Sequence, residues 1–339
     1  MTSPLSLALE RLQQRRDLSP EETAGAFGEV MSGMAAHDQM AALLLGLKEK
    51  GETAAEIAGT VRALRAVMVP VDAGAGAQVV DTCGTGGGVV GTFNISTGAA
   101  FVAAGAGARV AKHGNRSYTS RCGSADLFEA LGVNITHGAV EASRRLTSVG
   151  MAFMFAPSFH PAMRHLAPVR RQLKVATIMN LVGPLANPAR VRRQVVGVAD
   201  AARAPLIAEA LVELGTDHAI VAHGEIGMDE ISPVGPTTIL EVRGGAVRRW
   251  MLDPADHGLD WNRPEELAGG SPAENADRIE RLLRGAGHEA DRRAVLLNAA
   301  AAIYVAGLAE SYRAAVVAAT EGLVSGKARR VLEALRRAG

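Results

Sequence analysis

The chain has 339 residues, with 36 Lys and Arg against 35 Asp and Glu, a formal net charge of +1 and 48% hydrophobic residues. This balance argues against a surface that tracks nucleic-acid phosphates, and it supplies enough apolar residues for a large core. The 38 glycines show no collagen-like period, and the two cysteines, Cys83 and Cys122, are too few for a disulfide scaffold. The length predicts two domains, or one large domain with an appendage.

The opening segment, residues 1–16, is amphipathic and lacks the apolar core and small-residue cleavage site of a signal peptide. The longest apolar runs, at 99–111 and 295–309, are shorter than the ~18–20 residues that a membrane span needs. We therefore expect a cytoplasmic protein that contacts no membrane.

Residues 1–70 predict helices only. Two capping pairs mark helix starts, because a Ser or Thr is followed three positions later by Glu. The pairs are Ser19 with Glu22 and Thr53 with Glu56. Apolar residues follow at 24–31 and, with helical spacing, from Ile57 to Val67. Gly51 and Pro70 are predicted to end two of these helices.

The segment 40–47 is apolar almost all round, with leucines at 43, 44, 45 and 47. So small a helical unit does not easily bury such a segment alone. Two interpretations stand side by side: the segment is a dimer face, or it is buried against the rest of its own chain.

From Gly74 onward, short β-branched runs alternate with Ala- and Leu-rich helical stretches such as 204–214. Strands are expected at 78–81, 108–111, 151–155, 194–198 and 218–222. This alternation predicts a mostly parallel sheet covered by helices. Runs at 237–241 and 247–252 flank Gly244-Gly245 and predict an antiparallel hairpin. The polar stretch 253–276 is expected to be a surface excursion, and helices at 292–306, 310–323 and 327–337 close the chain.

The strongest single feature is a glycine-rich stretch that follows a buried strand. Five glycines lie between Gly84 and Gly91, and Asn94-Ile95-Ser96-Thr97 then opens an apolar helix. Glycine lets backbone N–H groups approach an anion closely, and a helix N-terminus adds donors and partial positive charge. The stretch therefore favours a phosphate or diphosphate site over a merely tight turn.

Two sequence features that usually accompany nucleotide-binding loops are missing here, and their absence narrows the class of phosphate ligand. Gly86-x-Gly88-x-x-Gly91 fits the dinucleotide pattern, but 106–112 holds no carboxylate where one for a ribose hydroxyl is expected. No Gly-Lys-Ser/Thr follows the loop, which excludes a Walker-type site. The hydroxyls of Ser96 and Thr97 are placed to meet a metal ion or a phosphate.

A second cluster, 112–120, follows a predicted strand and holds two cations, a histidine, an amide and several hydroxyls around a glycine. Such donors suit a ligand with several oxyanions, although a charged loop can also be solvated surface. We favour binding, because α/β sheets place ligands at the carboxyl ends of their strands. Cys122, just beyond, is interpreted as a small buried thiol rather than a nucleophile.

Two further motifs add charge. Asp229-Glu230 follows the strand at 218–222, and such a pair can hold a hard cation together with substrate phosphates, although alone it is more often solvated surface. Arg170 and Arg171 lie on a predicted helix, where they could clamp a carboxylate or simply form an exposed basic face.

Together these elements resemble the anthranilate phosphoribosyltransferases, an enzyme family of tryptophan biosynthesis. The resemblance covers nearly the whole chain. The matching strings are Asn94-Ile-Ser-Thr97 after the glycine loop, 112–116, Gly123-Ser124-Ala125-Asp126, His160-Pro161, Gly183-Pro184 and Asp229-Glu230.

The resemblance implies an α/β fold with a small all-helical N-terminal domain and a large α/β domain around a mostly parallel central sheet. The helical domain would comprise 1–72, joined by about 162–188, and the α/β domain 73–339. The site would lie at the hinge between them, and two chains would form a homodimer through the helical domain.

The resemblance also assigns ligands by position. Anthranilate would contact Gly84, Asn115 and Arg170, with Arg170 binding its carboxylate. Two Mg²⁺ ions per chain are implied, one held by Ser96 and Glu230 and the other by Asp229 with Glu230. Phosphoribosyl pyrophosphate would contact Gly84, Gly87, Gly88, Thr92, Asn94, Ile95, Ser96, Thr97, Lys112, His113, Gly114, Asn115, Arg116, Ser117, Tyr118, Thr119, Ser120 and Ser124.

The implied reaction is attack of the anthranilate amine on C1 of the ribose, with pyrophosphate leaving and N-(5-phosphoribosyl)anthranilate as product. Mg²⁺, Lys112 and the loop N–H groups would stabilise the leaving charge, so that catalysis is mainly positioning and electrostatics. The neutral amine needs no base before it attacks. Lys112 and His113 are the predicted catalytic residues, His113 as an acceptor of the later proton.

Two departures from the family pattern bear on this prediction. Gly88 stands where members commonly carry Asp, so one carboxylate of the diphosphate loop is missing, and we expect the backbone to bind nonetheless. Lys174 and Ala176 stand in 173–177 where members often read Leu-Gly-x-Arg-Thr, which puts the local turn near the anthranilate entrance in question.

Two alternative functions remain. A pyrimidine-nucleoside phosphorylase shares the fold, but it would usually have a longer carboxyl-terminal domain and no need of the Asp229-Glu230 pair. A non-catalytic relative that binds nucleic acid would want a basic surface, against which the net charge of +1 argues.

Overall fold

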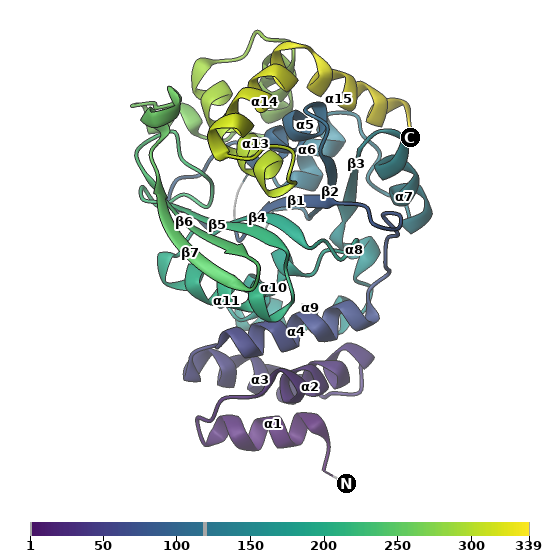
Figure 1. The fold of residues 1–339 in the computed structure, drawn as a ribbon. Helices are drawn as coiled ribbons and strands as arrows, with labels where there is room; N and C mark the ends of the chain where they lie inside the picture. Colours follow the sequence, from purple (N-terminus) through teal and green to yellow (C-terminus); the bar gives the residue numbers. More distant parts are fainter. Residues whose placement is uncertain (1, 118–120, 339) are drawn as a thin grey trace.

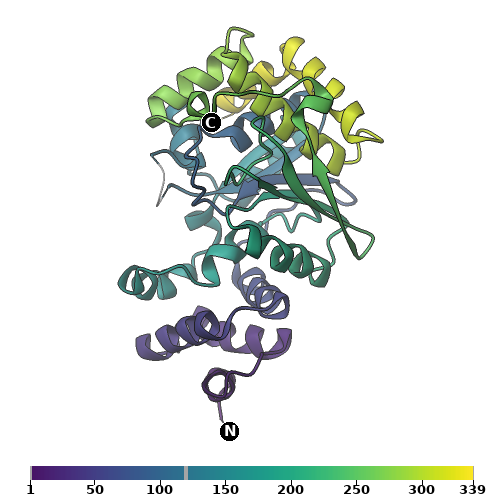
Figure 2. The same ribbon diagram turned by 90° about the vertical axis from the view of Figure 1, so that its left-hand side faces the viewer.

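A computed structural model describes residues 2–117 and 121–338 of the chain. The first four helices form a stack at one end of the molecule, and the rest of the chain builds a larger α/β body above it (Figures 1 and 2). The stacked helices are α1 (Pro4–Gln13), α2 (Pro20–Ser32), α3 (His37–Lys50) and α4 (Ala54–Val67). The predicted caps are confirmed, since Ser19 forms a capping box with Glu22 and Thr53 forms one with Glu56.

The apolar segment 40–47 lies in α3, and its own chain covers most of it. Met40, Leu43, Leu44 and Leu47 are buried in a core shared with α1, α9 and α10. For these four side chains, burial within the chain is therefore the interpretation that the structure supports.

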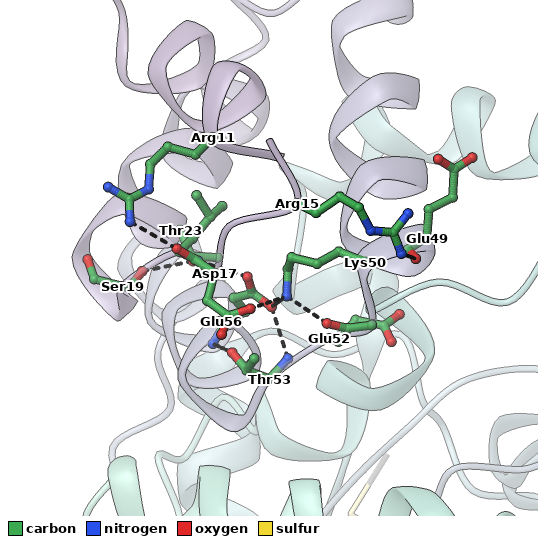
Figure 3. A network of polar contacts seen from close by, with 12 residues as sticks. Arg11, Arg15, Asp17, Ser19, Thr23, Glu49, Lys50, Glu52, Thr53 and Glu56 are labelled. Carbon is green, nitrogen blue, oxygen red and sulfur yellow. Dashed lines mark hydrogen bonds and ion pairs between the residues drawn. The ribbon is translucent and has the colours of Figure 1, made fainter. Parts of the chain in front are cut away.

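A partly buried ion-pair network joins the ends of the stacked helices (Figure 3). Lys50 Nζ lies 2.7 Å from Asp17 Oδ1 and 3.1 Å from Glu56 Oε2. Glu56, fully buried, also accepts hydrogen bonds from the backbone N–H groups of Leu18 and Thr53. Glu52, in the link between α3 and α4, pairs with Arg203 of the α/β body and so ties the two parts together.

The body is built on one seven-stranded sheet with the order β3-β2-β1-β4-β5-β6-β7. The first five strands are parallel, and β6 and β7 form the predicted antiparallel hairpin. The strands are β1 (Val79–Gly84), β2 (Arg109–Gly114), β3 (Met151–Phe155), β4 (Arg193–Gly197), β5 (His218–Gly224), β6 (Thr237–Arg243) and β7 (Ala246–Leu252). The predicted fold class is therefore confirmed.

One face of the sheet is covered by a helical layer whose centre is the nearly all-buried α5, which contacts α13, α14 and α15. The predicted closing helices are confirmed within a few residues, and α6, α7 and α12 are additional. The helices of this layer are α5 (Ile95–Gly105), α6 (Ser124–Ala130), α12 (Pro272–Leu283), α13 (Glu289–Val305), α14 (Tyr312–Val324) and α15 (Lys327–Arg337). Helix α7 (Ala139–Ser148) packs on the opposite face, where Ala142 and Leu146 lie in one core with Ala152 and Met154 of β3.

The other face meets the stacked helices through connecting segments (Figure 1). Here α9 packs on α2 and α3, while α10 and α11 pack on α4. One continuous core runs from α1 through these segments to one face of β4, β5 and β6. The connecting helices are α8 (Ala156–Phe159), α9 (Met163–Leu173), α10 (Met179–Val182) and α11 (Ala204–Glu213), with short 3₁₀ turns at Gly183–Leu185 and Ala201–Arg203.

The expected surface excursion at 253–276 is partly wrong. Two 3₁₀ turns, Pro254–His257 and Pro264–Leu267, anchor it, and Leu267 is fully buried. Its last residues begin α12, which starts with a third capping box between Ser271 and Glu274. No helix in the described part of the chain is both long and apolar enough to cross a membrane.

Candidate active site

The glycine-rich loop leaves the carboxyl end of β1, in the middle of the sheet. Gly84 is in register with Gly197 of β4, and the Thr85 N–H donates to the Gly197 carbonyl (2.9 Å). Gly86 and Gly87 follow with φ of +70° and +81°, a left-handed conformation that favours glycine. The loop therefore turns sharply at the point where the sequence predicts bound phosphate.

Helix α5 begins beside this loop, and its N-terminus faces a carboxylate. The Ser96 N–H donates to Glu230 Oε1 (3.1 Å), and the Gly86 N–H donates to Asp229 Oδ2 (2.9 Å). The structure thus brings the glycine loop, the first turn of α5 and the Asp229-Glu230 pair to one place. N–H groups of this kind stabilise anions, and here the anions are two carboxylates of the protein itself.

Burial perturbs both carboxylates. Burial and the neighbouring Asp229 raise the pKa of Glu230 to about 8, and burial raises the pKa of Asp229 above its usual value. No group of three or more His, Cys, Asp or Glu that could hold a metal occurs among the described residues. Two carboxylates beside a phosphate site are the donor set that Mg²⁺ takes when substrate oxygens complete its coordination, so these residues fit that ion.

Lys112, on β2, is a buried cation whose charge acts on Glu230. Its side chain is 2% exposed, and Nζ donates to the Thr82 carbonyl and lies 3.4 Å from Ser96 Oγ. Burial lowers the pKa of Lys112, while Asp81 and Glu230 oppose that change. The predicted catalytic lysine therefore lies between β1 and the first turn of α5.

The loop after β2 is held by α6. The Arg116 guanidinium pairs with Asp126 (3.1 Å) and Glu129 (2.5 Å), so that its cationic head is already neutralised by the protein. The Ser117 N–H donates to Asp126, and Ser124 Oγ lies 3.4 Å from the Asn115 carbonyl. The remaining predicted phosphoribosyl contacts of this loop, Tyr118, Thr119 and Ser120, lie outside the described residues.

The other predicted contacts follow the elements that carry them. Thr92 forms a bridge with Ala268, Asn94 accepts a hydrogen bond from Asn275, and Ile95 is buried. The Thr97 hydroxyl is buried with no partner in the described chain. Gly88 lies against the loop of Asp229, and Gly114 ends β2.

The hinge side of β2 carries the second predicted catalytic residue, His113. Its ring lies 5.0 Å from that of His160, and the two rings form hydrogen bonds to the backbone at Gly183 and Ala186. Burial and His160 lower the pKa of His113 to about 3, and burial lowers the pKa of His160 to about 4. A ring of such low basicity is a poor proton acceptor near pH 7, which argues against that role for His113.

Arg170 lies half-buried on α9, in the segment that follows His160. The helix ends at Lys174, whose φ of +54° is left-handed. Lysine therefore takes a left-handed conformation at the position where the family pattern has glycine.

Sequence reasoning did not single out Asp81 or Asn187, which are both fully buried beneath the site. Asn187 donates to Asp81 Oδ2 (2.7 Å) and to the Ala111 carbonyl (2.8 Å). Burial raises the pKa of Asp81 to about 6. The sequence signal for Asp81 was its position as a carboxylate within the otherwise apolar start of the strand at 79–82.

Known proteins resemble this arrangement over the whole chain. The model of the glycosyl transferase family helical bundle domain matches residues 7–68, and that of the family's a/b domain matches 76–329. The anthranilate phosphoribosyltransferase of Roseiflexus sp. (strain RS-1) is 48% identical over 333 residues, 98% of this chain and 97% of its own. The chain belongs to the anthranilate phosphoribosyltransferase family.

Solved structures of anthranilate phosphoribosyltransferases share the fold. The enzyme from Thermus thermophilus superposes with a TM-score of 0.92 at 40% identity, over 98% of each chain. The enzyme from Saccharomyces cerevisiae in complex with PRPP and Mg superposes with a TM-score of 0.90 at 27% identity, over 98% of this chain and 97% of that one.

Proposed function

We propose that this protein transfers the phosphoribosyl group of 5-phosphoribosyl 1-pyrophosphate to the amine of anthranilate, as a step of tryptophan biosynthesis. The observation that carries the proposal is the convergence of the glycine loop, the α5 N-terminus, Lys112 and Asp229-Glu230, in a member of this family. A diphosphate leaving group needs such a collection of donors, one cation and one metal-binding pair.

The chain's own groups bind and orient both substrates. The N–H groups of the glycine loop and of Ser96 bind the pyrophosphate oxygens, and Lys112 stabilises the charge that develops on them. The amine of anthranilate attacks C1 while the bond to pyrophosphate breaks. Arg170 orients the acceptor by pairing with its carboxylate, so that the amine faces C1.

Mg²⁺ belongs to the proposal as the resident cation, with two ions per chain. Ser96, Asp229 and Glu230 would hold it, and when bound it neutralises part of the diphosphate charge. The yeast relative's complex with PRPP and Mg supports the use of this metal in the family.

Three further features belong to the proposal. The domain division stays at 72/73, with 162–188 counted in the helical part, because α9 packs on α2 and α3. A homodimer through the helical part is supported by Leu7 on α1, which is 48% exposed. A cytoplasmic location is supported by Cys83 and Cys122, which are not joined in a disulfide.

One assay tests the reaction. Anthranilate fluorescence is followed with the purified chain, and its loss should require PRPP and Mg²⁺ together. Absence of turnover with both present, in protein that is folded by circular dichroism, would defeat the proposal. Turnover of a pyrimidine nucleoside with phosphate would instead support the phosphorylase alternative.

A narrower test concerns the acceptor. Arg170→Ala should raise the anthranilate KM about 10- to 100-fold and change the PRPP KM much less, because a charge-assisted pair contributes about 1.5–3 kcal/mol. An unchanged anthranilate KM would remove Arg170 from this role. Arg171→Ala, the next position on the same helix, is the matched control.

A further inference from the structure

The backbone ladder between β1 and β2 ends before the edge of the sheet that carries the proposed site, although the two strands remain in close contact. We call this unpaired stretch the split. The two strands are in register only at Val79 with Arg109 and at Val80 with Val110. Beyond these pairs each strand continues and still pairs with its outer neighbour, β1 with β4 as far as Gly84 and β2 with β3 as far as Gly114. The split therefore lies between two well-formed ladders.

Side chains replace the backbone ladder across this split. The His113 N–H donates to Asp81 Oδ1 (3.2 Å), and the Asn187 amide donates both to Asp81 Oδ2 (2.7 Å) and to the Ala111 carbonyl (2.8 Å). Buried backbone groups that lose a strand partner need another partner, and the Asp81–Asn187 pair supplies it for two of them.

The pair is also held from the hinge side. Asn187 Oδ1 accepts the Ala189 N–H (2.8 Å), and the neighbouring Pro188 carbonyl accepts the Val71 N–H (3.0 Å). Asp81 and Asn187 are each 0% exposed, so solvent does not compete for these bonds. The pair thus links β1, β2 and the segment that leads from α4 into the sheet.

Both walls of the split lead directly into the site. Thr82, next to Asp81, accepts the hydrogen bond from Lys112 Nζ, and His113, which Asp81 binds, follows Lys112 in the chain. Any change in the width of the split therefore moves the lysine relative to the glycine loop.

We propose that Asp81 and Asn187 are positioning residues for the phosphoribosyl transfer, which fix the spacing between the glycine loop and the loop that begins at Lys112. The inference rests on the proposed function. Neither residue contacts the substrate in this account; both act through the backbone and Lys112.

The primary variant is Asp81→Asn. Its side-chain oxygen still accepts the His113 N–H, but its new NH₂ group faces the NH₂ group of Asn187, so the bond between the two side chains is lost. We expect kcat/KM for PRPP to fall about 100-fold, because a misplacement of about 1 Å costs that much, with kcat and the PRPP KM both affected. A role in stability alone would lower the melting temperature and leave both constants unchanged per folded molecule.

The double variant Asp81→Asn/Asn187→Asp separates the two explanations further. It restores a donor and an acceptor between positions 81 and 187 with their roles exchanged. The bond to the Ala111 carbonyl is lost in Asn187→Asp and in the double variant alike, so the comparison of these two isolates the pairing. We expect kcat/KM of the double variant to exceed that of Asn187→Asp at least tenfold, whereas purely additive losses would overturn the pairing. If Asp81→Asn folds poorly, Asn187→Ser leaves Asp81 and its bond to His113 in place, and wild-type constants in that variant would equally overturn the proposal.

Glu241→Gln is the matched control. It removes another buried carboxylate of the same sheet, on β6, three strands away from β1 in the sheet order. We expect it to lower stability and leave the PRPP KM unchanged.

The design distinguishes failure of this inference from failure of the proposed function. Wild-type turnover tests the function, and the ratio of variant to wild type tests the pair. Calorimetric titration of the protein with pyrophosphate in the presence of Mg²⁺ gives a second readout that needs no turnover. Asp81→Asn should weaken this binding of pyrophosphate about tenfold or more. Wild-type affinity in the variant would refute the positioning role even in a protein without transferase activity.

Discussion

Gly197→Ala tests whether the Asp229-Glu230 loop must lie against the sheet for activity. A Cβ built on Gly197 lies 1.7 Å from the Asp229 carbonyl oxygen and 2.5 Å from its carbon, whereas real Cβ atoms do not approach other atoms within 3.0 Å. The contact is with backbone, so no side-chain rotation relieves it. The loop must therefore retreat by more than 1 Å.

That retreat acts on both carboxylates at once. Asp229 accepts the Gly86 N–H and Glu230 accepts the Ser96 N–H, at 2.9 and 3.1 Å, so a shift of 1 Å breaks both bonds. We expect kcat/KM for PRPP to fall about 100-fold and the Mg²⁺ concentration for half-maximal rate to rise. Overpacking should also cost about 1–3 kcal/mol of stability.

The assay is anthranilate fluorescence at several Mg²⁺ concentrations, with stability measured by urea unfolding on the same samples. Gly28→Ala is the control, because its Cβ meets nothing within 4 Å in the middle of α2. It should raise stability by about 0.5–1 kcal/mol and leave the rate unchanged. Wild-type kcat/KM in Gly197→Ala would refute the reasoning, since the loop would then tolerate displacement.

Three other predictions follow from single residues. Gly88→Asp should not improve the PRPP KM, because its Cβ would lie 3.2 Å from Asp229 Oδ1 and a third carboxylate would join the pair; steady-state kinetics with a greatly lowered KM would contradict this. Lys174→Gly should stabilise the protein by about 1 kcal/mol in urea unfolding, because lysine there has a φ of +54°, and no gain would show that the turn is unstrained. Burial and Asp229 raise the folded-state pKa of Glu230 to about 8, above its ordinary 4.5. The contribution of Glu230 to the free energy of unfolding is therefore present in full below pH 4.5 and is lost as the pH rises through 8. The melting temperature of the metal-free protein should consequently depend less on pH in Glu230→Gln than in wild type. Equal pH dependence in the two proteins would count against the raised pKa.

Local signals in the sequence were sufficient for most elements of the fold. Capping boxes and apolar spacing predicted the first helices, and β-branched runs predicted all seven strands within a few residues. The whole of α12 was missed, although Ser271 and Glu274 form the same capping box as Ser19 and Glu22, because the polar stretch 253–276 was interpreted as a surface excursion. Strand order was not predictable, since it depends on pairings between distant segments.

Some features of the candidate site could likewise be predicted from the sequence, and others could not. The sequence placed the glycine loop, Lys112 and Asp229-Glu230 after separate strands, and the parallel sheet then brings those strand ends together. It could not show that Arg116 is neutralised by α6, because that pairing depends on how α6 returns to the loop. Nor could it show the split between β1 and β2, which is a matter of tertiary register.

The free protein already fills its anion-binding groups with its own carboxylates. Asp229 and Glu230 accept the N–H groups of Gly86 and Ser96 that are proposed to hold pyrophosphate, so a bound diphosphate must displace them. Once displaced, the two carboxylates would lie beside each other and beside a phosphate, and a cation or a proton would be needed to relieve the repulsion. If these residues hold both ligands as proposed, we expect the diphosphate and Mg²⁺ each to favour the binding of the other. The near-neutral net charge of the chain does not reveal this arrangement, because the two cations of the loop, Lys112 and Arg116, offset Asp229 and Glu230 in the sum.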